Sequence, residues 1–146
     1  MSVLNVLLAE DNPGDILLVK EALAHHHISH ELYVVRDGGE ALAFLHRMGE
    51  TGSVPCPDVL LLDLNLPRVD GPEILVEFRK NPGCIHTPVI VISSSDTHKD
   101  RQRMDALGVN CYFRKPSDLE EFLKLGAVVR KVVEDGERSK DSSSER

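Results

Sequence analysis

The sequence contains no tryptophan, and aromatic side chains make up only 4% of its 146 residues. Since 41% of the residues are nevertheless hydrophobic, we expect one packed core built mainly from leucine, valine, isoleucine and alanine. No apolar run approaches the roughly 18 residues that a transmembrane helix requires. The N-terminal residues MSVLNVLLAED also lack the basic region and cleavage site of a signal peptide. These absences predict a cytoplasmic protein without a membrane segment.

An excess of basic residues is also absent. The chain has 17 Lys and Arg residues against 24 Asp and Glu residues, and its formal net charge is −7. A broad basic surface that binds nucleic-acid phosphates is therefore not expected. The charge balance favours a protein partner or a small cation.

Cysteine is scarce in this chain. Cys56, Cys84 and Cys111 are odd in number and widely spaced, which fits neither a disulfide framework nor a CxxC metal site. We therefore expect three reduced thiols, either buried or in loops.

Histidine is concentrated in the run His25-His26-His27 and in His30. This group has the composition of a metal site. It lies, however, where the first helix should end, and histidine there interacts favourably with the helix dipole. The sequence leaves open whether the group binds a metal.

Apolar periodicity and turn residues predict strands and helices in alternation. The expected strands are residues 4–9, 32–35, 59–63, 89–92 and 110–113. The expected helices are residues 15–24, 38–47, 72–80, 96–107 and 116–133. Five strands that alternate with five helices indicate an α/β fold with a parallel sheet and right-handed crossovers. We expect this domain to occupy residues 1–134 and the polar residues 135–146 to be disordered.

Acidic side chains follow two of these strands. Asp63 ends the apolar run Val59-Leu60-Leu61-Leu62, and Glu10 and Asp11 follow the first strand. Because ligands bind at the carboxyl ends of the strands in such sheets, the three carboxylates should meet there. Converging carboxylates repel one another and require a cation, and a set of oxygen ligands favours Mg²⁺. The alternative is that Asp11 only caps a helix and Asp63 is a solvated carboxylate.

The loops after two further strands carry a hydroxyl group and a cation. Ser93 follows the fourth apolar run, and Lys115 follows the fifth strand. Phosphoryl transfer to a carboxylate requires mainly positioning and neutralisation of charge, which Mg²⁺ and Lys115 would supply. The Ser93 hydroxyl could bond a phosphoryl oxygen and move its loop. The pattern thus predicts a phosphorylation-driven switch at Asp63.

Together these motifs resemble the receiver domain of two-component response regulators over roughly residues 4–133. The matching segments are Glu10-Asp11, Asp63 within LLLDLNLPRVDG, Ser93 after VIVI, and Lys115-Pro116. The resemblance implies a flavodoxin-like, doubly wound sheet of five parallel strands in the order 2-1-3-4-5, with five helices. It also implies a signalling switch that assists its own phosphorylation and dephosphorylation, not an enzyme with a separate substrate.

In that family, the acid at the position of Asp63 accepts a phosphoryl group from the phosphohistidine of a sensor histidine kinase. The resemblance implies that Asp11 and Asp63 bind Mg²⁺ directly and that Glu10 acts through water. It also implies that Asn65 contributes its backbone carbonyl to the metal.

The remaining motif positions have roles in the same family. The resemblance implies that Lys115 pairs with the phosphoryl group and that Ser93 is the switch hydroxyl. Tyr112 would be the aromatic side chain that turns inward when Ser93 engages the phosphoryl group. The alternative for Tyr112 is a packed aromatic ring with its hydroxyl at the surface.

Four features are similar to the response regulators that pair with bacterial phytochromes and other sensory hybrid kinases: the long loop 49–57, a last helix that runs into an extended tail, the segment AEDNPGD and the segment VISSSD. Few residues follow the last helix, so we expect a stand-alone receiver. Members of that subfamily often associate through the face of the fourth helix, fifth strand and fifth helix. A homodimer through residues around Arg101, Tyr112 and Phe122 is therefore a hypothesis.

Three other functions are alternatives. A phosphatase of the haloacid-dehalogenase type also uses a strand-end Asp, Mg²⁺ and a Lys, but its nucleophile belongs to an early DxD motif. The first strand carries Glu10-Asp11 without a DxD motif, and residue 65 is Asn, so the second acid is missing at both places. A nucleotide-binding flavodoxin-like protein would need a glycine-rich phosphate loop, and neither GxxxxGK[ST] nor GxGxxG follows any expected strand. The third alternative is a pseudo-receiver that only binds a partner.

Overall fold

The computed structural model describes residues 3–51, 56–64, 66–94 and 98–144. Its strands are β1 (Leu4–Ala9), β2 (His30–Val35), β3 (Val59–Asp63), β4 (Val89–Ser93) and β5 (Cys111–Arg114). Its helices are α1 (Pro13–His25), α2 (Gly38–Thr51), α3 (Gly71–Arg79), α4 (His98–Ala106), α5 (Leu119–Leu123) and α6 (Leu125–Ser144). A short 3-10 helix, η1 (Pro82–Cys84), lies between α3 and β4.

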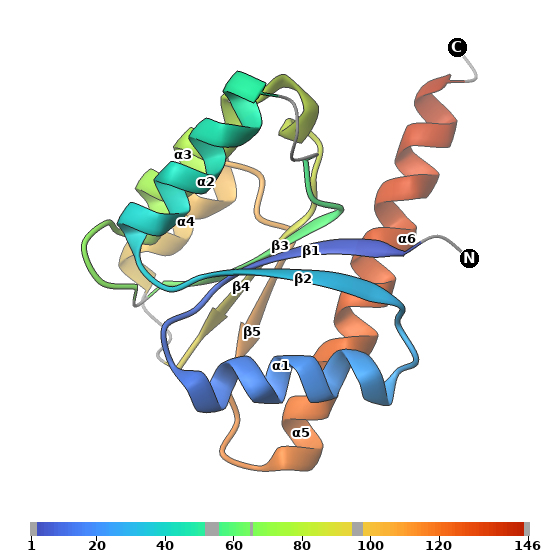
Figure 1. Ribbon diagram of the computed structural model, residues 1–146. Coiled ribbons are helices and arrows are strands. Elements are labelled where there is room, and N and C mark those ends of the chain that lie inside the picture. The colour runs from blue at the N-terminus through green and yellow to red at the C-terminus, as the bar shows by residue number, and fades with distance from the viewer. Residues whose placement is uncertain (1–2, 52–55, 65, 95–97, 145–146) are drawn as a thin grey trace.

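The strands form one parallel sheet in the order β2-β1-β3-β4-β5, which confirms the expected fold. The central strand β3 is buried along its whole length, as its continuous apolar run indicates for a strand covered on both faces. The register places Ala9 beside Leu62 and Asp63 beside Ile92. The residues that follow β1, β3 and β4 therefore leave the sheet at one edge. In Figure 1, β4 and β5 point toward the side on which α1 begins.

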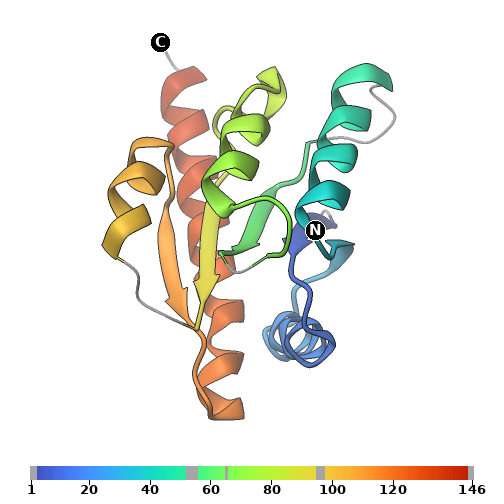
Figure 2. The same ribbon diagram turned by 90° about the vertical axis from the view of Figure 1, so that its left-hand side faces the viewer.

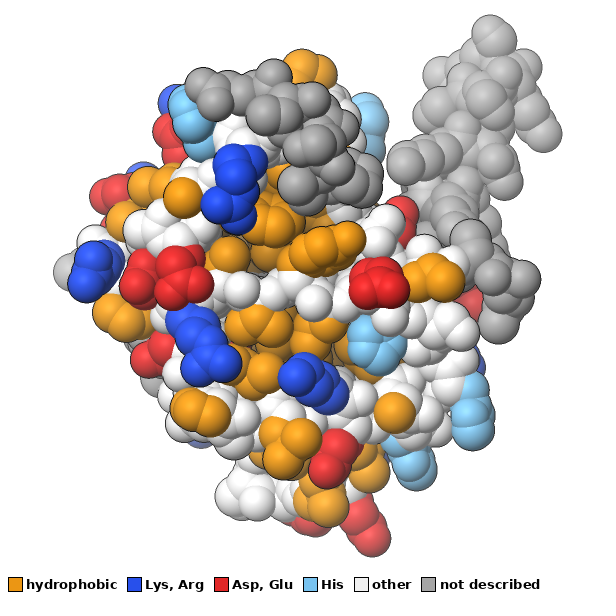
Figure 3. All heavy atoms as spheres, in the orientation of Figure 1, with side chains coloured by type: hydrophobic (Ala, Val, Ile, Leu, Met, Phe, Trp, Pro, Cys, Tyr) orange, Lys and Arg blue, Asp and Glu red, His pale blue; other side chains and the backbone are white. Residues whose placement is uncertain are grey.

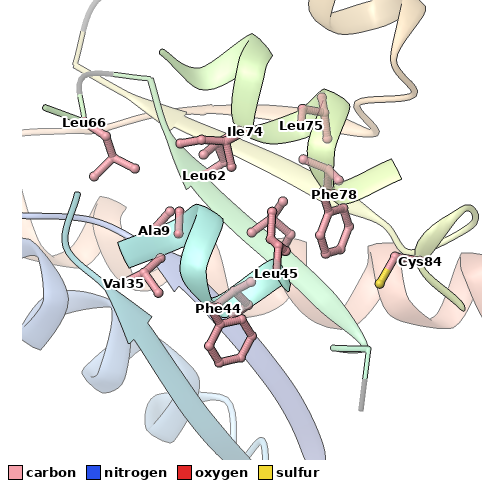
Figure 4. Packing of buried hydrophobic residues seen from close by; sticks show 14 of the residues in the cluster. Ala9, Val35, Phe44, Leu45, Leu62, Leu66, Ile74, Leu75, Phe78 and Cys84 are labelled. Atoms are coloured by element: carbon pink, nitrogen blue, oxygen red, sulfur yellow. The ribbon is translucent and has the colours of Figure 1, made fainter. Parts of the chain in front are cut away.

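Helices cover both faces of this sheet (Figures 1 and 2). One layer contains α2, α3 and α4, and the other contains α1, α5 and α6. Figure 4 shows the core under α2 and α3, where Leu45 and Phe78 pack with Leu62 of the sheet. The second core contains Phe122 of α5. Most buried side chains are aliphatic, as the composition predicts.

Side-chain caps decide where two helices begin. The Asn12 side chain accepts a hydrogen bond from the backbone N–H of Asp15 at 3.1 Å, and α1 starts at Pro13. Asp70 caps α3 in the same way, with the Glu73 N–H at 2.9 Å. A proline in a first turn costs nothing, because its missing N–H would have no partner within the helix. The caps hold the first turns of α1 and α3 in place at the carboxyl edge of the sheet.

The last helical segment differs from the single helix expected at residues 116–133. A break separates α5 from α6, and there the Leu123 carbonyl accepts a hydrogen bond from Nε2 of His26 at 3.0 Å. Gly126 packs against the His26 ring so closely that a Cβ atom would not fit. The helix α6 then continues to Ser144, whereas disorder was expected from residue 135. Extending an existing helix needs no new nucleus, and Glu, Arg and Lys are favourable helix residues.

The expectation of three reduced thiols is wrong for one pair. Cys56 and Cys84 form a disulfide, with Cα atoms 5.7 Å apart, and Cys111 is free. The two cysteines precede the neighbouring strands β3 and β4, so the parallel pairing brings them to the amino-terminal edge of the sheet. Their separation of 28 residues gave no sign of this contact.

The histidine run does not assemble a metal site among the described residues. No histidine belongs to the group of three possible metal ligands found there. The His26 ring bonds the Leu123 carbonyl, and Nδ1 of His30 donates to the Ile28 carbonyl at 2.7 Å.

Within the described ranges, no helix is long and apolar enough to cross a membrane. On the face in Figure 3, basic side chains lie scattered among acidic and apolar ones.

Candidate functional site

Three carboxylates meet at the carboxyl edge of the sheet. Glu10, Asp11 and Asp63 each offer one ligand atom, and these atoms lie within 4.8 Å of one another. Glu10 and Asp63 are buried, whereas Asp11 is exposed. The meeting confirms the expectation that the two acidic strand ends converge, because β1 and β3 are neighbours in the sheet.

The backbone around Glu10 holds its side chain in this position. Its N–H donates to the Val35 carbonyl of β2 at 2.9 Å. Its Oε1 accepts a hydrogen bond from the N–H of Asn12 at 3.1 Å. The loop that begins α1 thus also orients the carboxylate.

Lys115 contacts two of these three acids, Glu10 and Asp63. Its Nζ is 2.8 Å from Oε2 of Glu10 and 3.1 Å from Oδ2 of Asp63. A third carboxylate, that of Asp15, lies at 2.8 Å. The backbone N–H of Lys115 donates to the Ser93 carbonyl at 2.8 Å, which extends the alignment of β4 and β5 by one residue. An ammonium group has three N–H donors, so these contacts use all of them.

Burial and charge shift the protonation of the site in opposite directions. Burial raises the pKa of Glu10 to about 7, although the hydrogen bond from Lys115 opposes the shift. Burial lowers the pKa of Lys115, but the hydrogen bonds to Asp15 and Glu10 outweigh it, so its pKa is raised overall. Lys115 is therefore charged at neutral pH, while Glu10 is poised near its titration point.

The donor set of this site suits a hard divalent cation. Every ligand atom of the acidic group is a carboxylate oxygen, and Mg²⁺ prefers oxygen ligands. Two of the three acids are buried, where uncompensated negative charge is costly. Asn65, the expected source of a backbone carbonyl, lies outside the described residues.

Ser93 and Tyr112 lie on the adjacent strands β4 and β5, but their side chains have different surroundings. Ser93 is the last residue of β4, so it lies at the same edge of the sheet as the acidic group, and it is buried. The Tyr112 hydroxyl lies 2.8 Å from Oδ1 of Asp105 and 3.2 Å from the Arg101 carbonyl, both on α4. The Arg101 guanidinium stacks on the ring at 4.4 Å. Burial and Asp105 raise the pKa of Tyr112 to about 12. In this structure α4 therefore holds the tyrosine.

The assignment of Phe122 to the expected dimer face is wrong. Phe122 is only 1% exposed, and its ring packs edge-on against Phe113 with centroids 5.9 Å apart. It belongs to the core between α5 and the sheet and cannot contact a partner. Arg101 is exposed and Tyr112 is partly exposed, so those two remain available to the hypothesis.

Sequence reasoning missed Asp15 as a partner of Lys115. The sequence marks Asp15 only as the residue at which the first helix is expected to begin. The two residues are 100 positions apart, and no spacing rule joins them. The available signal was that a carboxylate in the first turn of α1 must lie at the same edge as the strand ends.

Comparison with known proteins decides the family. The sequence profile described as the response regulator receiver domain matches residues 6–126. This chain belongs to the response regulator receiver domain family. The resemblance inferred from the motifs is thereby confirmed.

Several receiver proteins are similar to this chain. Response regulator Rcp1 of Synechocystis sp. is 42% identical over 120 residues, which are 82% of each chain. The probable methanogenesis regulatory protein FilR2 of Methanothrix harundinacea is 34% identical over 116 residues, 80% of this chain and 74% of that protein. Both alignments span most of each protein.

Solved receiver structures share the fold. The phosphorylated cyanobacterial phytochrome response regulator RcpA superimposes with a TM-score of 0.78 at 39% identity, covering 89% of this chain and 93% of RcpA. The Mn²⁺-bound form of Rcp1 gives 0.73 at 41% identity, covering 84% and 88%. Receiver-family membership favours a signalling protein over the phosphatase and the nucleotide-binding alternatives.

Proposed function

We propose that this protein is a phosphorylation-operated switch in which Asp63 accepts a phosphoryl group from a sensor histidine kinase. The observation that supports this most is the convergence of Glu10, Asp11 and Asp63, with Lys115 at 3.1 Å from the acceptor carboxylate. A nucleophilic carboxylate, acidic metal ligands and a cation are the parts that phosphoryl transfer requires.

In the proposed reaction, a carboxylate oxygen of Asp63 attacks the phosphorus atom of the donor. A P–O bond forms, the P–N bond to the kinase histidine breaks, and the imidazole leaves and takes up a proton. Lys115 would neutralise charge on the phosphoryl oxygens. Glu10, Asp11 and Asp63 would hold Mg²⁺, which supplies further charge neutralisation when bound. The same groups would assist the later hydrolysis of the acyl phosphate.

The output depends on Ser93 and Tyr112. We propose that the Ser93 hydroxyl bonds the new phosphoryl group, that its loop moves, and that Tyr112 leaves Asp105 and turns toward Ser93. A hydrogen bond to a charged group contributes about 1.5–3 kcal/mol. One or two such bonds can therefore switch only states that already lie within a few kcal/mol of each other.

The partners follow from the relatives and the surface. Likeness to RcpA, a phytochrome response regulator, supports a phytochrome-type or hybrid kinase as the phosphoryl donor. A homodimer would use the exposed face of α4 and β5, including Arg101 and Tyr112, without Phe122. We place this receiver unit at residues 1–134, in the cytoplasm, with neither nucleic acid nor membrane as a partner.

The test is intact-mass spectrometry after incubation with acetyl phosphate, first with Mg²⁺ and then with EDTA. Wild type should gain a single phosphoryl adduct that requires Mg²⁺, because Asp63 is the nucleophile and the acidic group needs a cation. Asp63→Asn should gain none.

The alternative outcomes separate the remaining functions. An equal adduct on Asp63→Asn would contradict the assignment of the acceptor. Absence of any adduct on wild type would favour the binding-only pseudo-receiver. Sustained hydrolysis of a phosphate ester would favour a phosphatase.

A further inference from the structure

We propose that Asp15 is a positioning residue that holds the Lys115 ammonium in place for the phosphoryl group. This inference rests on the proposed function and adds a residue to it. Asp15 is not one of the three acids that converge as metal ligands, yet its carboxylate contacts the same lysine at 2.8 Å.

The contact is as short as any that Lys115 makes. Glu10 also lies at 2.8 Å, whereas the acceptor Asp63 lies at 3.1 Å. The lysine side chain is 12% exposed and that of Asp15 is 23% exposed. Hydrogen bonds between charged groups are shorter and stronger than neutral ones, and partial burial reduces their screening by water. The Asp15 contact is therefore a substantial restraint on the ammonium.

Asp15 also differs from the other two partners in what happens during the reaction. Glu10 and Asp63 have competing roles, since one is a metal ligand and the other becomes phosphorylated. Each must give up part of its contact with Lys115 when a cation or a phosphoryl group arrives. Asp15 has no second role, so its hydrogen bond persists while the remaining N–H donors turn to the phosphoryl oxygens.

The position of Asp15 is well defined by the start of α1. Its backbone N–H is held by the Asn12 cap at 3.1 Å, and Pro13 restricts the first turn. A carboxylate in the first turn of a helix is favoured by the helix dipole. The first turn of α1 thus fixes one donor of Lys115 independently of β1 and β3.

The experiment measures the rate of adduct formation from acetyl phosphate with saturating Mg²⁺. The variants are Asp15→Ala and Asp15→Asn, each in the wild-type background and with Lys115→Met. Glu73→Ala is the matched control, because Glu73 is a first-turn carboxylate of α3 that is not among the partners of Lys115. Thermal unfolding of every variant checks that the fold is intact.

Asp15→Ala should slow adduct formation roughly tenfold, since a displacement of a catalytic group by about 1 Å can cost up to about a hundredfold in rate. Asp15→Asn should be slowed less, because its amide oxygen still accepts a hydrogen bond but carries no charge. In the Lys115→Met background, Asp15→Ala should change the rate by less than about twofold, as the two residues act through one contact. Glu73→Ala should behave like wild type.

Each other outcome has a distinct meaning. If wild type forms the adduct and Asp15→Ala matches Glu73→Ala, the role of Asp15 is refuted and the proposed function stands. That role is also refuted if removal of Asp15 slows both backgrounds equally, because Asp15 would then act without Lys115. Should wild type form no adduct, the proposed function fails and the role of Asp15 fails with it. Where Asp15→Ala is destabilised, Asp15→Asn and its double variant decide.

Discussion

The affinity of this protein for Mg²⁺ should fall as the pH falls through 7, and Glu10 should be the cause. Burial raises the pKa of Glu10 to about 7, so its side chain is an uncharged acid below that pH and a carboxylate above it. A protonated carboxyl group is a poor metal ligand and contributes no negative charge. At low pH the metal must therefore displace a proton from Glu10, so the affinity for Mg²⁺ decreases as the pH falls.

The magnitude follows from the ionised fraction of Glu10. One pH unit above its pKa about nine-tenths of the side chain is ionised, and one unit below only about one-tenth is ionised. The apparent dissociation constant for Mg²⁺ should thus increase about tenfold between about pH 8 and about pH 6. The lysine at 2.8 Å stays charged throughout this range, because its own pKa is raised.

Isothermal titration calorimetry is a suitable assay, since the chain has no tryptophan to report binding by fluorescence. Wild type should show the tenfold change, and Glu10→Gln should bind more weakly but lose most of the pH dependence. Exposed Glu73→Gln serves as the control and should follow wild type. Equal affinity of wild type at both pH values, or an undiminished change in Glu10→Gln, would refute the argument.

Three further predictions concern the disulfide, the core and the switch. Cys56→Ser should lower the free energy of unfolding by about 3–4 kcal/mol in denaturant titrations, because the disulfide closes a loop of 28 residues. A reductant should lower the free energy of unfolding of wild type by a similar amount and leave that of the variant unchanged. Phe78→Ala should cost about 3–5 kcal/mol, since the ring is fully buried under α3, and a loss below about 1 kcal/mol would contradict that packing. Ser93→Ala should still form the adduct, but its NMR chemical shifts in α4 should change less on phosphorylation than those of wild type. Shift changes as large as those of wild type would argue against Ser93 as the switch.

Much of the site was predictable because it depends on strand ends. An apolar run such as Val59–Leu62 identifies a buried parallel strand, and the residue that follows it must lie at the carboxyl edge. Glu10, Asp63 and Lys115 all follow from this rule. Their convergence needed also the strand order, which the resemblance to receiver domains implied correctly.

Other features depend on contacts that no local pattern encodes. The break between α5 and α6 arises where His26 bonds the Leu123 carbonyl, although the residue types around position 124 favour a continuous helix. Tyr112 lies against Asp105 because β5 and α4 pack together, and its hydroxyl alone does not indicate which side it faces.

The sequence by itself determined the α/β fold, the aliphatic core and the identity of the acids, hydroxyl and lysine at the edge of the sheet, and its resemblance to receiver domains implied the strand order. These properties depend on periodicity and on short motifs, which are local. Only the tertiary structure decided that Asp15 shares Lys115 with Glu10 and Asp63, and that Cys56 meets Cys84. Those contacts join residues 100 and 28 positions apart, and the chain brings them together only when neighbouring strands and the helices between them pack.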